Sequence, residues 1–274
     1  MDEPDTAWAR RLWARAVRET FLLAMLGPTM DVYARCRVVG SEALAGVEGP
    51  VILVANHCSH MDTPEILRSL PRPLRRRTAV AAAADYFYRS RRRAIAVSLA
   101  FNTVPMRRHG GGLEPGPAQH VHALIDDGWS LLIFPEGTRS RDGRIGRLRS
   151  GAAALAIAHG LPIVPVHVTG TRAAMPVGQS WPRRLPGRGP GRRHDVEIRF
   201  GAPIRPTAVD DRHAVMERVR QFFASCGAPT TPYEPGGIAV GVAQAHGQGA
   251  EVGRFGGGDP ERHAGTIQRP RSPG

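Results

Sequence analysis

The chain has 274 residues, of which 42% are hydrophobic and 22% charged, and this composition is typical of a folded globular protein. Its formal net charge is +13, and all 37 cationic side chains are arginines because the sequence contains no lysine. Arginine keeps its charge when desolvated and binds phosphate through paired hydrogen bonds. The composition therefore excludes an acidic protein and indicates an anionic partner: nucleic acid, anionic lipid or a phosphorylated substrate.

The cysteines and the apolar runs limit the cellular setting. The three cysteines show no paired spacing, so a reducing compartment is expected rather than a disulfide framework: Cys36, Cys58 and Cys226. Residues 1–5 are acidic, and no signal peptide is expected. No apolar run approaches the roughly 20 residues of a membrane-spanning helix.

The N-terminal segment is predicted to be an amphipathic helix, because apolar side chains recur at helical spacing through residues 6–26. Gly27 and Pro28 are expected to end it. One face carries aromatic residues and another carries cations: Trp8, Trp13 and Phe21 against Arg11, Arg15 and Arg18. Such a helix is typical of a membrane interface, although a helix packed on the domain would show the same periodicity.

Short apolar runs alternate with helical segments in the rest of the chain. Strands are predicted at residues 36–39, 51–54, 78–83, within 101–106, and at 130–134, 161–168 and 195–200; helices are predicted at 64–70, 85–99, 119–127, 151–159 and 211–225. Pro162 and Pro165 predict that the strand at 161–168 is irregular. The sequence divides into the helix 1–27, a domain at 28–226 and a Gly/Pro-rich tail at 227–274 that is predicted to be disordered.

The strand at 51–54 leads into the first candidate site. Thr63 and Pro64 are predicted to cap and start the next helix, which places His57 and Asp62 in the turn between strand and helix. Open α/β sheets place their sites at such turns. There Asp62 can accept a hydrogen bond from one ring nitrogen of His57 and leave the other nitrogen free as a base.

A second candidate site follows the strand at 130–134. Gly137 allows a ligand to approach the backbone, Arg139 can bind a phosphate with its guanidinium fork, and Glu136 can accept a hydrogen bond from a hydroxyl. A surface turn with a solvated ion pair would give the same residue pattern.

Four sequence blocks together resemble the PlsC-like glycerolipid acyltransferases, which include the lysophosphatidate acyltransferases. The blocks occur in the order His57-x4-Asp62, Arg107 after Thr103-Val104-Pro105, the run FPEGTRS at 134–140, and IVPV at 163–166. The resemblance covers about residues 37–225 and implies an α/β fold with a mostly parallel central sheet flanked by helices, so that residues 28–226 form an acyltransferase domain. It implies transfer of a fatty acyl group from a CoA or acyl-carrier-protein thioester to the free hydroxyl of a lysophospholipid, foremost 1-acylglycerol-3-phosphate.

The resemblance also implies roles for single residues. His57 is the expected general base and Asp62 orients it, while the acceptor's glycerol phosphate is bound by Arg107, Glu136, Gly137, Thr138 and Arg139. Arg108 competes with Arg107 for this role. No metal and no prosthetic group are implied, because the acyl thioester is a co-substrate. The expected location is cytoplasmic, at the anionic inner face of the cell membrane.

Alternative functions remain open from the sequence. Cys58 or Ser59 could be a nucleophile activated by His57. A metal-dependent hydrolase could use His57, His60, Asp62 and Glu136 as ligands. A non-enzymatic protein that binds RNA or DNA would also need arginines, but the aromatic residues show no stacking pattern. Within the acyltransferases, another lysolipid or a glycolipid precursor could be the acceptor.

Overall fold

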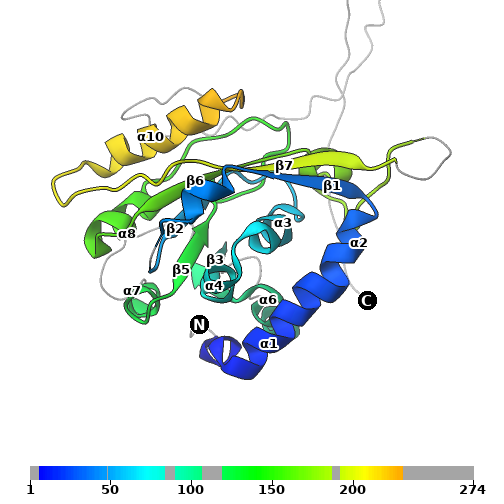
Figure 1. The fold of residues 1–274 in the computed structure, drawn as a ribbon, viewed down its shortest axis with the longest axis horizontal. Helices are drawn as coiled ribbons and strands as arrows, with labels where there is room; N and C mark the ends of the chain where they lie inside the picture. Colours follow the sequence, from blue (N-terminus) through cyan, green and yellow to red (C-terminus); the bar gives the residue numbers. More distant parts are fainter. Residues whose placement is uncertain (1–5, 48, 84–89, 107–118, 187–191, 231–274) are drawn as a thin grey trace, which may run out of the picture. The chain divides into compact units, whose positions relative to one another are not determined.

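The computed structural model describes residues 6–47, 49–83, 90–106, 119–186 and 192–230. Within them the chain forms a seven-stranded sheet in the order β1-β7-β6-β2-β5-β3-β4 (Figure 1). The strands are β1 (Ala34–Val39), β2 (Ile52–Ala55), β3 (Thr78–Ala83), β4 (Thr103–Met106), β5 (Ser130–Ile133), β6 (Ile163–Thr169) and β7 (His194–Phe200). All neighbouring strands are parallel except β6 and β7, which confirms the predicted mostly parallel α/β sheet.

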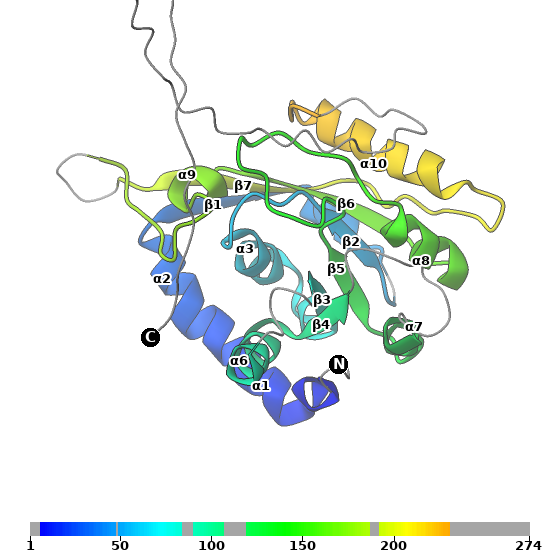
Figure 2. The ribbon, with the colours of Figure 1, turned by 180° about the vertical axis from the view of Figure 1, so that it is seen from behind.

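Helical segments connect the strands and cover the sheet. They are η1 (Ala7–Arg10), α1 (Leu12–Thr20), η2 (Phe21–Leu26), α2 (Gly27–Asp31), η3 (Ser41–Leu44), α3 (Asp62–Ser69), α4 (Arg72–Arg76), α6 (Arg91–Phe101), α7 (Gln119–Asp126), α8 (Gly151–His159), α9 (Thr171–Ala174) and α10 (Arg212–Ser225). Figures 1 and 2 show α3 and α10 on opposite sides of the sheet. The helix predicted at 151–159 is confirmed with the same bounds, whereas α4 was not predicted.

Strand β2 lies at the centre of the hydrophobic core, and all four of its residues are buried. Leu53 packs in a cluster with residues of η2, α2 and α3 on one face. Ile52 and Val54 pack in a second cluster with α7, α8 and α10 on the other face. Successive side chains of a strand point to opposite faces, and a parallel strand covered on both faces needs apolar residues at every position. This explains the uninterrupted apolar run before His57.

Helix α3 starts earlier than predicted. It begins at Asp62, after Met61 as N-cap, and Thr63 lies inside the first turn. The prediction that Thr63 is an extended N-cap is therefore wrong. The physical reason is that the buried Asp62 carboxylate accepts the backbone N–H groups of Cys58 and Ser59 from the preceding turn, and this fixes the helix start before the Thr63–Pro64 bond.

Strand β6 is regular and lies inside the sheet, so the predicted irregularity at 161–168 is wrong. It pairs with β2 on one side and with β7 on the other. Pro165, which lacks a backbone N–H, stands one residue before the antiparallel ladder begins with the pair Val166 and Phe200. Its carbonyl still accepts from Gly201 N at 2.9 Å, so the missing donor falls just beyond Phe200, the last residue of β7.

The N-terminal helix continues past its predicted end. Helical structure runs through α1, η2 and α2 as far as Asp31, with Pro28 in the first turn of α2. The π-helical η2 directly precedes this proline, and a widened turn accommodates a residue without an N–H donor. At the other end of the domain, Pro229 accepts a hydrogen bond from Ile145 N at 2.8 Å. From residue 231 onward, the predicted disordered tail lies outside the described residues.

Candidate active site

Asn56 fixes the point at which the chain leaves β2 for the site. Its side-chain Nδ2 donates to Val168 O at 2.9 Å, and its Oδ1 accepts from Val168 N at 2.7 Å. The buried amide thus replaces a backbone peptide in the ladder with β6. The sequence interpretation missed this residue, although an asparagine directly after a buried apolar run was the available signal.

His57 and Asp62 form the contact that their spacing predicted. His57 Nδ1 lies 2.8 Å from Asp62 Oδ2, and the Asp62 side chain is fully buried. The same oxygen accepts from Cys58 N at 2.7 Å and Ser59 N at 2.8 Å, while Oδ1 accepts from Thr171 Oγ1 at 2.6 Å. An ionised carboxylate can only accept hydrogen bonds, so His57 Nδ1 must donate to Asp62. In a neutral His57 ring the proton is therefore on Nδ1. The Nε2 nitrogen is then left with its lone pair available as a base.

The His57 ring stacks on Phe134, with centroids 4.1 Å apart and planes inclined by 23°. The His57 side chain keeps 18% of its surface exposed. One face of the imidazole is therefore packed while a substrate can still reach the ring. Phe134 lies in the sequence block that was recognised, but its role as a support for the ring was not predicted.

Glu136 connects the second loop to the first. Its Oε1 accepts from His57 N at 2.9 Å, and its Oε2 accepts from Gly146 N at 3.0 Å. Ser140 N donates to His57 O at 2.8 Å, so both polar groups of the His57 backbone are held by the loop after β5. Burial raises the pKa of the Glu136 carboxyl. The structure thus brings Glu136 to the site as a group that positions the His57 backbone.

The remaining residues of this loop lie beside the histidine pair. Gly137 has φ of 71°, and a Cβ atom there would stand 3.1 Å from Arg149 Nε, so only glycine fits without strain. Thr138 is exposed and Arg139 is half-buried. Burial first, and then the positive charges of Arg139 and His57, lower the pKa of His60 to about 4. Arg139 makes no hydrogen bond and no ion pair with another described residue, so its guanidinium can bind an anion.

Arg107 and its competitor Arg108 lie outside the described residues. Strand β4, which leads toward them, is described as far as Met106 and pairs in parallel with β3. The expectation that Arg107 joins Arg139 at one phosphate therefore stays a prediction.

The geometry does not favour Cys58 or Ser59 as a nucleophile. Burial and the negative charge of Asp62 raise the pKa of the Cys58 thiol to about 12, and the thiolate is the reactive form. Ser59 is fully buried. Its hydroxyl donates to Met175 O at 2.8 Å and accepts from Met61 N at 3.1 Å, which leaves no contact with His57 to activate it.

Cys58→Ala is accordingly expected to keep acyl transfer close to the wild-type rate, because the thiol takes no part in the reaction. The measurement is single-turnover transfer followed by intact-protein mass spectrometry. A covalent acyl adduct on Cys58 or Ser59 that forms and decays at the rate of turnover would contradict direct transfer.

The metal alternative also lacks a suitable geometry. Across the described segments of the chain, no three His, Cys, Asp or Glu side chains gather closely enough to hold a metal ion. Burial and then the positive charge of Arg139 lower the pKa of His60 to about 4, and a cation close to the ring opposes the binding of a metal ion there.

The fold is thus a mostly parallel α/β sheet, and a hydrogen-bonded His–Asp pair lies in the turn between β2 and α3. Residues 35–169 match the model of the family described as Acyltransferase. Residues 35–169 therefore form a domain of the acyltransferase family.

Individual relatives agree with this assignment. The chain is 27% identical to the chloroplastic 1-acyl-sn-glycerol-3-phosphate acyltransferase BAT2 of Brassica napus, over 57% of this chain and 44% of that protein. It is 29% identical to LPAT1 of Arabidopsis thaliana, over 57% of this chain and 42% of that protein. The match thus spans less than half the length of these plant relatives. The crystal structure of PlsC from Thermotoga maritima superposes with a TM-score of 0.54 at 22% identity, covering 81% and 83% of the two chains, and supports the fold.

Proposed function

We propose that this protein transfers a fatty acyl group from a thioester donor to the free hydroxyl of 1-acylglycerol-3-phosphate, forming phosphatidic acid. The observation that carries the proposal is the His57–Asp62 pair, with Nε2 left as a base and the cation Arg139 close by. The similarity to two plant 1-acyl-sn-glycerol-3-phosphate acyltransferases supports this acceptor. The donor is CoA-linked or linked to an acyl carrier protein.

The proposed reaction follows from the positions of these groups. His57 Nε2 accepts the proton of the acceptor hydroxyl while the hydroxyl oxygen attacks the thioester carbonyl carbon. The tetrahedral intermediate collapses with cleavage of the C–S bond, and the imidazolium returns its proton to the departing thiolate. Asp62 holds the ring and stabilises its charged form. General-base catalysis of this kind contributes about 10²–10⁴ in rate.

The test is a panel of acceptors with one long-chain acyl-CoA or acyl carrier protein, read by mass spectrometry. We expect 1-acylglycerol-3-phosphate to give the highest kcat/KM. A clear preference for another lysolipid or for a glycolipid precursor would keep the mechanism and change the acceptor. Thioester hydrolysis without transfer to any acceptor would contradict the proposal.

Arg139 is proposed to bind the acceptor phosphate. Arg139→Ala is expected to raise the KM for a phosphate-bearing lysolipid by about tenfold or more, since a charge-assisted hydrogen bond contributes about 1.5–3 kcal/mol. Arg139→Lys should also raise it, because lysine keeps the charge but loses the fork. The measurement is steady-state kinetics with each substrate varied in turn.

Arg141→Ala is the matched control, because Arg141 is an exposed cation of the same loop. The Arg139 effect should shrink for a monoacylglycerol acceptor, which has no phosphate, and the KM for the donor should stay unchanged. An effect confined to the donor would mean that the loop contacts the CoA phosphates instead.

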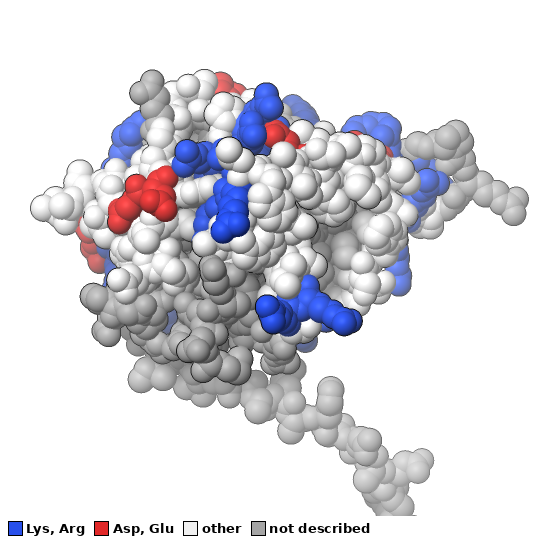
Figure 3. Space-filling model, turned by 90° about the horizontal axis from the view of Figure 1, so that it is seen from below, with Lys and Arg blue, Asp and Glu red and all other residues white. Residues whose placement is uncertain are grey.

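The N-terminal helix supports a proposed peripheral association with the inner face of the cell membrane. No helix in the described part of the chain is long and apolar enough to cross a bilayer. However, α1 and η2 point large apolar side chains outward: Leu12 is 74% exposed, Trp13 52%, Val17 47% and Met25 61%. Figure 3 shows wide uncharged areas between groups of arginines on the molecule seen from below. Exposed apolar residues on a helix are typical of interfacial binding.

The prediction that Arg18 belongs to the basic face of this helix, at the membrane interface, is wrong. Arg18 is only 8% exposed and donates to Ala9 O at 2.6 Å and to Leu99 O at 3.0 Å. Its guanidinium thus binds carbonyls near the C-terminal end of α6, where cations are favoured. The cationic side of α1 therefore packs toward the protein and its apolar side faces outward, the reverse of a soluble amphipathic helix.

Trp13→Glu and Val17→Glu are each expected to weaken binding to anionic vesicles by about tenfold, since full burial of one large apolar side chain contributes about 1.5–3 kcal/mol. Vesicle co-sedimentation measures this. Val209→Glu is the control, because Val209 is 94% exposed outside the helix. Equal binding of all three variants and the wild type would show that α1 does not enter the membrane.

A further inference from the structure

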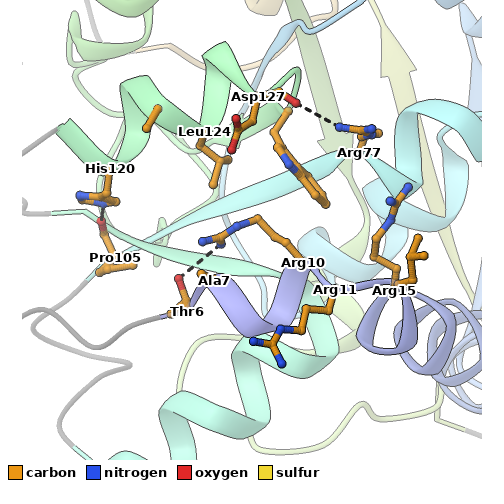
Figure 4. Close-up of a pocket in the computed structure, with 13 residues that line it drawn as sticks. Thr6, Ala7, Arg10, Arg11, Arg15, Arg77, Pro105, His120, Leu124 and Asp127 are labelled. Atoms are coloured by element: carbon orange, nitrogen blue, oxygen red, sulfur yellow. Dashed lines mark hydrogen bonds between the residues drawn. The ribbon is translucent and has the colours of Figure 1, made fainter.

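A cleft of about 750 Å³ lies between the N-terminal helical segments and α7 (Figure 4). Among the residues that the structure describes, four arginines line it against one acidic side chain: Arg10, Arg11, Arg15 and Arg77 against Asp127. In Figure 4, Arg10, Arg15 and Arg77 lie around the cleft while Arg11 points away from it. A concave site of this size fits a small molecule, and its charge favours an anion.

The cleft is separate from the reaction centre. Arg77 and Trp129 directly precede the parallel strands β3 and β5 and so lie at their amino ends. His57 and Glu136 follow the carboxyl ends of β2 and β5. The four residues of β5 place the two ends about 13 Å apart, at roughly 3.3 Å per residue. A group bound in the cleft would therefore be remote from His57 Nε2.

Arg15 and Arg77 form no ion pair with another described residue, although Arg77 Nη1 donates to Asp127 O at 3.0 Å. The guanidinium carbons of Arg15 and Arg77 lie 5.5 Å and 5.6 Å from the centroid of the Trp129 ring. Burial, and next the charge of Arg77, lower the pKa of Arg15. The Arg15 Nε atom is buried and has no hydrogen-bond partner. The negative charge of Glu19 opposes this lowering, but Glu19 forms its ion pairs with Arg72, Arg75 and Arg76.

We propose that this cleft is a second binding site, for a phosphate group, in which Arg10, Arg15 and Arg77 hold the oxygens and Trp129 forms the wall. Guanidinium groups match phosphate geometry, and a bound phosphate would give Arg15 and Arg77 an anionic partner. The phosphate can belong to a lipid headgroup or to a soluble phosphorylated molecule. Leu12 both lines the cleft and is 74% exposed on the apolar side of α1, so a headgroup could reach the site.

The soluble source is tested by titration calorimetry with inorganic pyrophosphate. The full-length chain carries Arg139→Ala throughout, so that the proposed acceptor site does not contribute. We expect binding to persist in this background, and Arg15→Gln or Arg77→Gln to weaken it about tenfold. Arg212→Gln, which removes one exposed cation of α10, should leave it unchanged. Thermal unfolding checks each variant, and Arg10→Gln replaces any variant that does not fold.

The lipid source is tested with phosphatidylcholine vesicles that contain or lack phosphatidylglycerol. A headgroup site predicts that Arg15→Gln loses more anionic-vesicle binding than Arg92→Gln, which removes an exposed cation of α6 outside the cleft. Loss in both assays supports a phosphate site open to soluble ligands, and loss with vesicles alone supports a headgroup site. Equal vesicle losses for the two variants, together with unchanged pyrophosphate binding, would overturn the proposal and leave Arg15 and Arg77 as packing partners of Trp129.

Discussion

His57→Ala is expected to abolish acyl transfer while the protein remains folded. The ring is removed from a partly exposed turn, where its main contacts are the hydrogen bond to Asp62 and the stack on Phe134. Without Nε2 the acceptor hydroxyl has no base, and the rate should fall by about 10²–10⁴. Thiol release from acyl-CoA in the presence of the lysolipid measures the loss.

The control for this change is His122→Ala. His122 lies on α7 and contacts His159 at 2.7 Å, away from the loops that hold His57. Its loss should leave turnover near wild type, while circular dichroism and the melting temperature show that both variants fold. A folded His57→Ala protein with near wild-type turnover would end the general-base mechanism.

Asp62→Asn is expected to lower both activity and stability. The carboxylate orients the His57 ring, and it also accepts the hydrogen bonds of three other buried donors. An amide cannot accept from His57 Nδ1, Cys58 N, Ser59 N and Thr171 Oγ1 together, since its NH₂ group would face one set of donors. In a Ser-His-Asp enzyme the matching change costs about 10⁴ in kcat, which we take as an upper guide. A buried donor left unpaired also lowers the free energy of unfolding by roughly 1–3 kcal/mol. Turnover and the free energy of unfolding are measured together.

Thr171→Val separates the effect of Asp62 on the orientation of His57 from its effect on folding stability. It removes the 2.6 Å hydrogen bond to Oδ1 and the 3.3 Å contact of the Thr171 hydroxyl with Cys58 Sγ, and it leaves the contact between Oδ2 and His57 in place. We therefore expect a loss of stability with most of the turnover retained. If Thr171→Val reduced turnover as much as Asp62→Asn, the effect of Asp62 would come from local folding rather than from orientation of the ring.

In the loop after β5, some features could be predicted from the sequence and others could not. The strand, the turn and the glycine at 137 could be predicted from local pattern, because a left-handed φ favours glycine. The binding partners of Glu136 could not, because His57 N and Gly146 N come within its reach only when β2 and β5 are neighbours in the sheet. Sequence spacing contains no information on which strands pair across 79 residues.

The sequence by itself determined the local features of this protein: the strand–turn–helix unit around His57, the His57–Asp62 contact, and most strand and helix positions. These depend on periodicity and on residues a few positions apart. Only the tertiary structure decided which face of α1 turns outward, why Arg18 is buried, how Pro165 fits inside the sheet, and where Arg15, Arg77 and Trp129 meet. The physical reason is that periodicity identifies residues that share a face, whereas the direction of that face is set by packing with segments far away in the chain.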